Sequence, residues 1–537
     1  MRSSFFTLLA AGFACALASC SGGGHQPSLA GAGNPSSSAG AVVTRNYDNA
    51  RSGVNLQETV LTPDSVNAAH FGKLFSFAVD GSIYGQPLYV PAVSVAGKGT
   101  HNVVYVATEN DSVYAFDADH GGGGPLWKTS LVDAAAGETS IPCADVVGCA
   151  AASTIGVTAT PVISLDRNAI YVEARSKQNS AYLHKLHALD LASGKEKFGG
   201  PVVIHASVPG TAADADAQGI VNFNDLREND RSALLLVNGV VYMCFASLSD
   251  VGPYHGWVLA YNADTLHQVA VFNVTPNGTQ GGIFANNGPV ADDSANIYAV
   301  TGNGTPPPGS NFGQTLLKLS GASLKVVDFF TPFNAAVMNL TNIDVGSGGF
   351  LLLPDQSGTA HPHLLVGAGK EGRIYLIDRD NLGKHNAQSD QIVQSIPNAV
   401  GPGDDSVFYS PVFWNGNVYF SGTQDVIKAF SLNNGRLSTA PVMQAAATFT
   451  FPGAGLILSA NGSSGGILWA LEWHEASHLG TLHAYDAQNL ARELWNSDQS
   501  GARDSAGATT RLNVPLVING KVYVSGKTNL LVYGMLP

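Results

Sequence analysis

The feature that most constrains the fold is a strand pattern that recurs along the chain. Its clearest copy is residues 103–119, where an apolar strand, a polar turn at 109–111 and a second strand lead to an Ala-aromatic-Asp sequence. Alternating Val, Tyr and Phe favour a pleated, half-buried surface, while Asn, Asp and Gly favour the bends. Recurrence of such a unit indicates a repeat architecture.

Each unit contains a strand often opened by Pro, a Val-Tyr-Val-type strand and a third strand. We count eight units, whose third strands are residues 112–117, 186–190, 258–261, 315–319, 373–378, 426–430, 481–486 and 530–533. A fourth strand follows five of them, at 126–130, 202–205, 269–274, 326–330 and 494–495. The eighth unit has none after it, and the strand at 73–78 is available to supply one.

Stacking the units around an axis buries both faces of each sheet and leaves few open edges. The sequence therefore predicts an all-β fold: an eight-bladed β-propeller of four-stranded antiparallel blades, with the ring closed by an N-terminal strand. We expect residues 45–537 to form this single domain.

Composition excludes some partners. The net charge is −13, and only 12% of residues are charged. An acidic surface without long blocks of one sign argues against binding to nucleic acid. We expect a monomer whose only membrane attachment is a lipid anchor.

The first residues predict export. Arg2 precedes an apolar run at 5–17, which is typical of a signal peptide and too short for a membrane span. The ending Leu17-Ala18-Ser19-Cys20 resembles the lipobox of bacterial lipoproteins, which implies a signal peptide at 1–19 and lipidation of Cys20; the alternative is an ordinary cleavage site. Residues 20–44, rich in Gly and Ser, predict a flexible tether. We expect an outer-membrane lipoprotein facing the periplasm or the cell surface.

The remaining cysteines suit an oxidising compartment. Cys143 and Cys149 flank a short loop, so a disulfide between them is plausible. Cys244 lies in a strand-like run and is expected to be a buried apolar residue. The absence of Cys-x-x-Cys-His excludes covalently attached haem.

One motif fits a zinc peptidase. His474-Glu475-Ala476-Ser477-His478 matches His-Glu-x-x-His, whose chemistry requires a helix that places both imidazoles on one face. The pentad falls between two predicted strands, 467–472 and 480–486. We therefore predict a hairpin loop.

Three blades carry a more specific pattern: Ala115-Phe116-Asp117 with Trp127, Ala188-Leu189-Asp190 with Gly194, and Ala484-Tyr485-Asp486 with Trp495. It resembles the blade motif of quinoprotein-type β-propellers, the pyrroloquinoline-quinone (PQQ) repeat superfamily, in which the Trp docks one blade on the next. Residues 47–53 and 369–373 resemble segments of uncharacterised bacterial members. The motif specifies blades and does not specify chemistry.

The resemblance implies two functional classes. Dehydrogenases of the family place PQQ on the propeller axis, between a Trp and a disulfide of adjacent cysteines, with Ca²⁺ or a lanthanide beside it and an Asp as base. This chain has no Cys-Cys pair, and no metal ligand or catalytic residue can be transferred to it. Glu173 and Asn286 could donate oxygen to a hard cation.

Candidate ligand-contacting residues are few. His255 and Trp257 lie at the start of an inner strand, and Lys370 and Arg373 lie in a charged turn. We expect a binding or scaffold protein of the cell envelope, with envelope proteins or a small molecule at the propeller axis as partners. The alternative is a PQQ-dependent dehydrogenase that oxidises alcohols or sugars with Ca²⁺ and an external electron acceptor.

Overall fold

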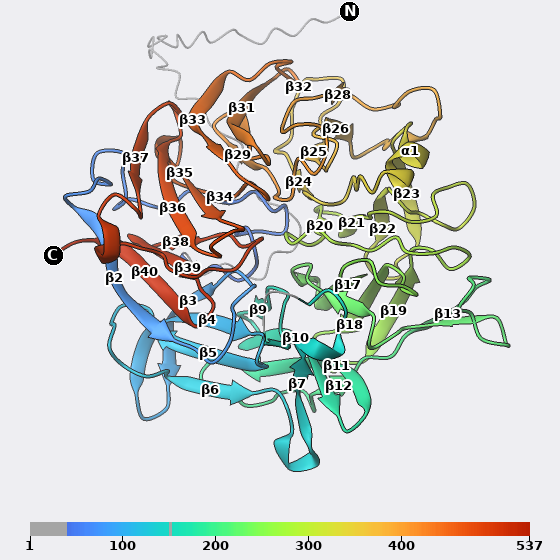
Figure 1. Cartoon of the computed structure of the whole chain (residues 1–537), viewed down its shortest axis with the longest axis horizontal. Coiled ribbons are helices and arrows are strands. Elements are labelled where there is room, and N and C mark those ends of the chain that lie inside the picture. Colours follow the sequence, from blue (N-terminus) through green and yellow to red (C-terminus); the bar gives the residue numbers. More distant parts are fainter. Residues whose placement is uncertain (1–39, 150–152) are drawn as a thin grey trace, which may run out of the picture. The chain divides into compact units, whose positions relative to one another are not determined.

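The computed structural model describes residues 40–149 and 153–537. Over these residues the chain is an eight-bladed β-propeller of mostly four-stranded antiparallel sheets (Figure 1), as predicted. The predicted signal peptide, Cys20 and the tether as far as residue 39 lie outside the described residues. Among the described residues no helix has both the length and the hydropathy needed to cross a membrane.

The first four blades follow chain order from the innermost strand outwards. Their strands are β3 (Leu88–Val95), β4 (Gly99–Thr108), β5 (Ser112–Asp117) and β6 (Trp127–Ser130); β9 (Val162–Ser164), β10 (Ala169–Gln178), β11 (Ala181–Asp190) and β12 (Val202–Val203); β16 (Leu235–Val237), β17 (Val240–Ser247), β18 (Trp257–Asn262) and β19 (Gln268–Asn273); and β20 (Val290–Ala291), β21 (Asn296–Val300), β22 (Leu316–Ser320) and β23 (Val326–Thr331).

Blades five to eight include two outer strands that sequence reasoning missed, β28 and β33. The strands are β24 (Phe350–Leu352), β25 (Leu364–Ala368), β26 (Ile374–Asp378) and β28 (Gln394–Ile396); β29 (Val412–Trp414), β30 (Asn417–Phe420), β31 (Asp425–Asn433) and β33 (Met443–Phe449); β34 (Ala454–Asn461), β35 (Ser464–Trp473), β36 (Gly480–Asp486) and β37 (Glu493–Asn496); and β38 (Leu516–Ile518), β39 (Lys521–Ser525), β40 (Asn529–Met535) and β2 (Phe71–Ala78).

The ring closes through β2, which pairs antiparallel with β40 and completes the eighth blade. This closure by an N-terminal strand was predicted, and it joins distant parts of the chain (Figure 1, blue beside red). It removes the open edge that β40 would otherwise present.

Short additional elements decorate the blades. They are β1 (Val54–Asn55), β7 (Glu138–Pro142), β8 (Thr154–Ile155), β13 (Ser207–Pro209), β14 (Ile220–Asn222), β15 (Glu228–Asp230), β27 (Lys384–His385), β32 (Arg436–Leu437), α1 (Ala335–Leu340) and the 3₁₀ turns η1 (Ala134–Ala136), η2 (Cys143–Asp145) and η3 (Gly501–Arg503). The pentad at 474–478 lies between β35 and β36 without helix, so the hairpin prediction is confirmed.

Local sequence explains the turns. Asn-Gly pairs join β16 to β17, β29 to β30 and β38 to β39, and both residues of each pair have positive φ. This is the conformation that a two-residue type I′ hairpin requires. The Asp that ends a third strand caps the next turn: the Asp117 carboxylate accepts a hydrogen bond from the Asp119 amide at 2.9 Å, and Asp486 accepts one from Gln488 at 2.9 Å.

Tyrosines of the second strands connect neighbouring blades. The Tyr171 hydroxyl donates to the Ala263 carbonyl at 2.8 Å, and the Tyr242 hydroxyl donates to Gly321 at 2.8 Å. Tyr105, Tyr419 and Tyr523 make equivalent bonds. The Val-Tyr-Val pattern therefore specifies blade docking as well as strand formation.

Candidate axial ligand site

Residues 42–55, here the axial segment, contact the innermost strand of every blade. Backbone bonds or side-chain amides and hydroxyls reach Tyr89 of β3, Ile163 of β9, Leu236 of β16, Ala291 of β20, Leu352 of β24, Phe413 of β29, Leu458 of β34 and Val517 of β38. Val42 forms a β-bridge with Tyr89 and is 1% exposed. Residues 42–44, at the end of the predicted tether, are buried against the inner strands.

Arg51 fixes the axial segment from within. Its guanidinium is fully buried and donates to the carbonyls of Pro289 at 3.2 Å, Leu234 at 3.1 Å and Arg45 at 2.9 Å. Burial lowers the pKa of Arg51 to about 9, with the nearby Asp48 carboxylate acting in the opposite direction. A charge this deep is tolerated because several carbonyl dipoles satisfy its donors.

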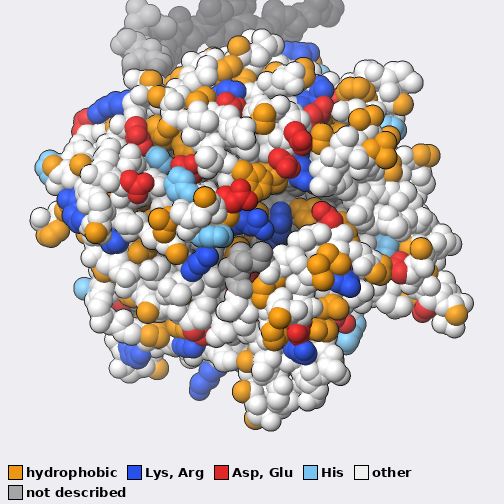
Figure 2. All heavy atoms as spheres, in the orientation of Figure 1, with side chains coloured by type: hydrophobic (Ala, Val, Ile, Leu, Met, Phe, Trp, Pro, Cys, Tyr) orange, Lys and Arg blue, Asp and Glu red, His pale blue; other side chains and the backbone are white. Residues whose placement is uncertain are grey.

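A pocket of about 80 Å³ lies on the axis beside this segment. Six of its lining residues come from loops that precede the innermost strands: Tyr84, Thr158, Arg231, Asn286, Arg511 and Leu512. Arg45 of the axial segment donates to the Leu512 carbonyl at 3.2 Å, so the segment lies directly behind the pocket wall. Figure 2 shows basic side chains gathered at the hollowed middle of one face.

Two pocket arginines have donors to spare. Arg231 donates through Nε to the Phe284 carbonyl at 2.8 Å, and its guanidinium lies 5.3 Å from the Phe284 ring centroid. Burial lowers the pKa of Arg231 to about 10, and the Arg511 cation acts in the same direction. Among the described residues neither arginine forms an ion pair with a carboxylate, and the same holds for Arg45 and Arg51.

One carboxyl group lines the same pocket. Glu109 is 4% exposed and accepts hydrogen bonds from the Gly156 amide at 2.7 Å and the Thr158 hydroxyl at 2.8 Å. Burial raises the pKa of Glu109 from 4.5 to about 7, and the two hydrogen bonds act against that rise. This carboxyl group therefore keeps its proton to a higher pH than an exposed glutamate does.

The wall contains a disulfide. Cys143 and Cys149 are bonded, and Cys149 lines the pocket together with Gly148 and Leu248. Cys244 is free and buried, as expected. The disulfide closes a short loop after β7, and the end of this loop, Gly148 and Cys149, borders the pocket.

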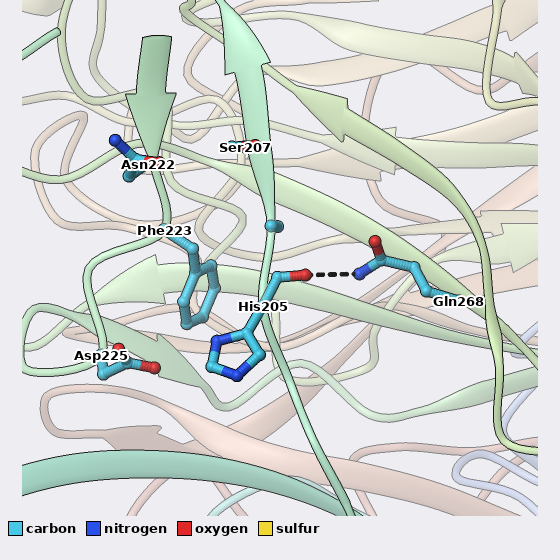
Figure 3. Close-up of a pocket in the computed structure, with 7 residues that line it drawn as sticks. His205, Ser207, Asn222, Phe223, Asp225 and Gln268 are labelled. Atoms are coloured by element: carbon cyan, nitrogen blue, oxygen red, sulfur yellow. Dashed lines mark hydrogen bonds between the residues drawn. The ribbon is translucent and has the colours of Figure 1, made fainter. Parts of the chain in front are cut away.

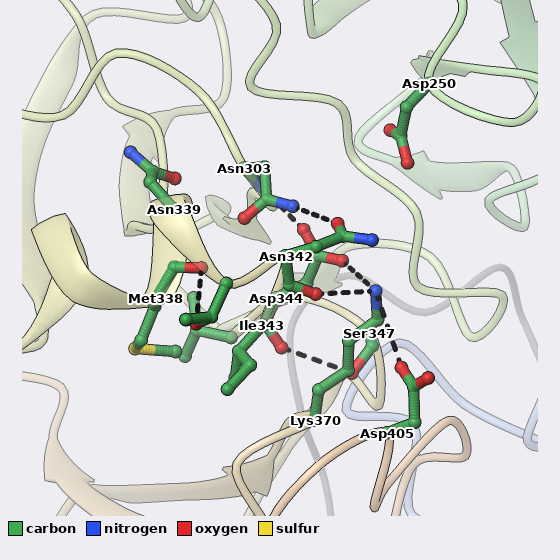
Figure 4. A network of polar contacts seen from close by, with 12 residues as sticks. Asp250, Asn303, Met338, Asn339, Asn342, Ile343, Asp344, Ser347, Lys370 and Asp405 are labelled. Atoms are coloured by element: carbon green, nitrogen blue, oxygen red, sulfur yellow. Dashed lines mark hydrogen bonds and ion pairs between the residues drawn. The ribbon is translucent and has the colours of Figure 1, made fainter.

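Lys370, a candidate from the sequence, belongs to a satisfied polar network (Figure 4). Its ammonium pairs with Asp344 at 2.6 Å, donates to the Asn342 carbonyl at 3.1 Å and lies 3.7 Å from Asp405. Asp344 also accepts the Asn303 amide at 2.7 Å. The Lys370 ammonium is therefore neutralised by Asp344, and its contacts connect loops of the propeller.

The other candidates lie away from the axial pocket. Trp257 is fully buried in the core between the second and third blades and donates to Glu228 at 3.3 Å. Arg373 binds Glu371 through two hydrogen bonds of 3.0 and 3.1 Å. His255 contacts Asp214 at 3.1 Å and Thr275 at 2.9 Å.

Sequence reasoning missed Arg231, Arg511, Glu109 and the role of the axial segment. The available signal was an arginine shortly before the strand that opens a blade, at Arg231 before β16 and at Arg511 before β38. Such positions face the axis in a propeller, but only the assembled ring shows that two of them converge.

The pocket does not fit a PQQ–calcium centre. Its volume of about 80 Å³ is well below the roughly 300–1,000 Å³ typical of pockets for larger ligands. No tryptophan lines it, and its disulfide joins cysteines that are not adjacent. The described residues contain no group of three or more His, Cys, Asp or Glu side chains placed to hold a metal ion.

Comparison with known proteins finds similar folds but no similar sequence. No protein-family model and no curated protein matches the sequence. A europium-containing methanol dehydrogenase superposes with a TM-score of 0.61 and 13% identity, over 92% of this chain and 98% of its own. The quinohemoprotein alcohol dehydrogenase ADHIIG from Pseudomonas putida HK5 gives 0.59 and 13%, over 92% of this chain and 80% of its own.

BamB from Moraxella catarrhalis gives a TM-score of 0.48 and 12% identity, over 86% of this chain and 99% of its own. At these identities the comparisons bear on the fold alone. The chain is an eight-bladed propeller with the fold of the quinoprotein-type alcohol dehydrogenases.

Proposed function

We propose that this chain is an exported, lipid-anchored binding protein of the outer membrane that holds a small carboxylate at the propeller axis. The observation that carries the proposal is the convergence of Arg231 and Arg511 on one pocket, where neither forms an ion pair with a carboxylate of the described residues. Export and anchoring rest on the basic start, the apolar run and the Leu-Ala-Ser-Cys ending.

The chemistry of the pocket favours a carboxylate. Guanidinium groups bind carboxylates through paired hydrogen bonds and are always charged near neutral pH. Buried Arg45 adds positive charge behind the pocket wall, and burial lowers its pKa to about 10. The volume of about 80 Å³ suits a ligand with one or two carboxylates and few further atoms.

Calorimetric titration of the full chain with malonate and acetate, with inorganic phosphate as comparison, tests the proposal. We expect saturable malonate binding that weakens about tenfold or more in Arg511→Ala, because a hydrogen bond to a charged group contributes about 1.5–3 kcal/mol. Arg492→Ala, which removes an exposed arginine away from the axis, should bind like the parent chain.

Absence of malonate binding at millimolar concentration, or equal binding by Arg511→Ala, would refute the proposal. A parallel titration with PQQ and Ca²⁺ tests the alternative that the chain is a PQQ-dependent dehydrogenase. Saturable quinone binding would show that the pocket opens beyond its present volume.

A further inference from the structure

We propose that a second site, outside the axis, binds a neutral saccharide. Two adjoining cavities of about 300 and 630 Å³ share Asn222, Phe223 and Asp225 as lining residues. We call the combined space the hairpin groove, because it lies beside the β13–β14 hairpin. Both volumes fall within the roughly 300–1,000 Å³ typical of small-ligand pockets.

The hairpin is an insertion between the second and third blades. β13 and β14 pair antiparallel with each other and form a separate two-stranded sheet (Figure 1). The segment after β14 returns toward the propeller and carries Phe223 and Asp225. Tyr182 of β11 and Gln268 of β19 complete opposite walls, so the groove uses both blades.

The groove presents polar groups that have no partner in the described part of the chain (Figure 3). Asp225 Oδ1 is buried and accepts no hydrogen bond. The His205 ring and the Ser207 hydroxyl also make none. Gln268 donates to the His205 carbonyl at 2.8 Å and the Tyr261 hydroxyl at 2.9 Å, while its amide oxygen accepts none.

An orphaned buried acceptor costs free energy, so Asp225 favours a ligand that donates a hydrogen bond. Burial raises the pKa of Asp225, with nearby His184 and His205 acting in the opposite direction. The second acid of the groove, Asp214, already faces His255 at 3.1 Å.

The lining favours hydroxyl donors over charged ligands. No lysine or arginine lines either cavity, which disfavours phosphorylated, sulfated or acidic ligands. Amide, hydroxyl and carboxylate groups alternate with the rings of Phe223 and Tyr182. A saccharide combines hydroxyl donors with an apolar face of C–H groups, and this lining complements both.

The anchor residues are held rigidly. Phe223 packs edge-on against Phe245 at 4.9 Å and against His184 at 5.2 Å between ring centroids. His184 pairs with buried Glu173 at 2.7 Å and contacts the Asp225 carbonyl at 3.2 Å. Such pre-organisation reduces the entropy lost on binding.

Calorimetric titration of the full chain with cellotriose and maltotriose tests the inference. We expect saturable binding of at least one trisaccharide, weakened about tenfold or more in Asp225→Asn, because a hydrogen bond to a charged acceptor is replaced by a neutral one. His205→Ala should weaken binding in the same direction.

Asp216→Asn is the matched control. Asp216 lies between β13 and β14, is exposed and lines neither cavity, so its variant should bind like the parent chain. Equal melting temperatures of the Asp225 and Asp216 variants would show that the fold is intact. Absence of binding by both trisaccharides at millimolar concentration, or affinity unchanged in Asp225→Asn, would overturn the inference.

A titration with spermidine tests whether the hairpin groove binds a cation and not a neutral saccharide. Spermidine binding that competes with the trisaccharide, or replaces it, would also overturn the assignment to a neutral saccharide. Arg511→Ala should leave trisaccharide binding unchanged, so failure here and failure of the axial proposal are distinguishable.

Discussion

Replacement of Glu109 by Gln should make the free energy of unfolding fall less as the pH rises. Glu109 is 4% exposed, and burial raises its pKa from 4.5 to about 7. Glutamine has the shape of the protonated acid and keeps one acceptor for Gly156 or Thr158. The variant therefore reproduces the neutral state of Glu109 at every pH.

The direction of this pH effect follows from the linkage between proton binding and folding. Below pH 4.5 the carboxyl group is protonated in both the folded and the unfolded chain, and it contributes no pH-dependent difference. Between pH 4.5 and about 7 the unfolded chain loses its proton first, so the free energy of unfolding falls as pH rises. At about 1.4 kcal/mol for each pKa unit, the loss from this residue reaches about 3 kcal/mol above pH 7.

Urea unfolding followed by tryptophan fluorescence at several pH values between 4.5 and 8 measures the effect. We expect Glu109→Gln to gain about 3 kcal/mol relative to the parent chain across this range. Glu475→Gln, at an exposed position between β35 and β36, is the control and should show no such gain. A difference between parent and Glu109→Gln that stays constant with pH would refute the reasoning.

Two further predictions concern the axial segment and the docking of one blade on the next. Arg51→Met should lower the free energy of unfolding by at least about 3 kcal/mol, because it leaves the buried carbonyls of Pro289 and Leu234 without donors. The midpoint of urea unfolding measures this change. A midpoint equal to that of the parent chain would contradict the role of the axial segment. Tyr171→Phe should cost about 1 kcal/mol through loss of the bond to the Ala263 carbonyl. Tyr485→Phe, at a tyrosine whose buried hydroxyl forms no hydrogen bond in the described part of the chain, is its control in the same assay.

The blades could be predicted because their determinants are local. Alternation of Val, Tyr and Phe specifies strands, and Asn-Gly pairs such as Asn519-Gly520 specify hairpins through positive φ at both residues. Two outer strands, β28 and β33, escaped prediction because long loops precede them and their burial is partial. Closure through β2 was predictable because the eighth blade lacked a fourth strand and the strand at 73–78 belonged to no other blade.

The site could not be predicted in the same way. Arg231, Arg511 and Glu109 come from three blades, and nothing in their local sequence marks them as neighbours. The sequence did suggest the pair Cys143 and Cys149, but not that their disulfide borders the axis. Trp257 and Lys370 carried equally suggestive local patterns, yet one is buried between blades and the other is neutralised by Asp344.

The sequence by itself determined the repeat, the number of blades and the strand that closes the ring, because each depends on periodicity and on turn chemistry within a few residues. Only the tertiary structure decided which side chains share the axis and the hairpin groove. The physical reason is that burial and charge compensation depend on residues far apart in the chain, so an arginine becomes a ligand contact or a structural link according to the carboxylates that the folded ring brings near it.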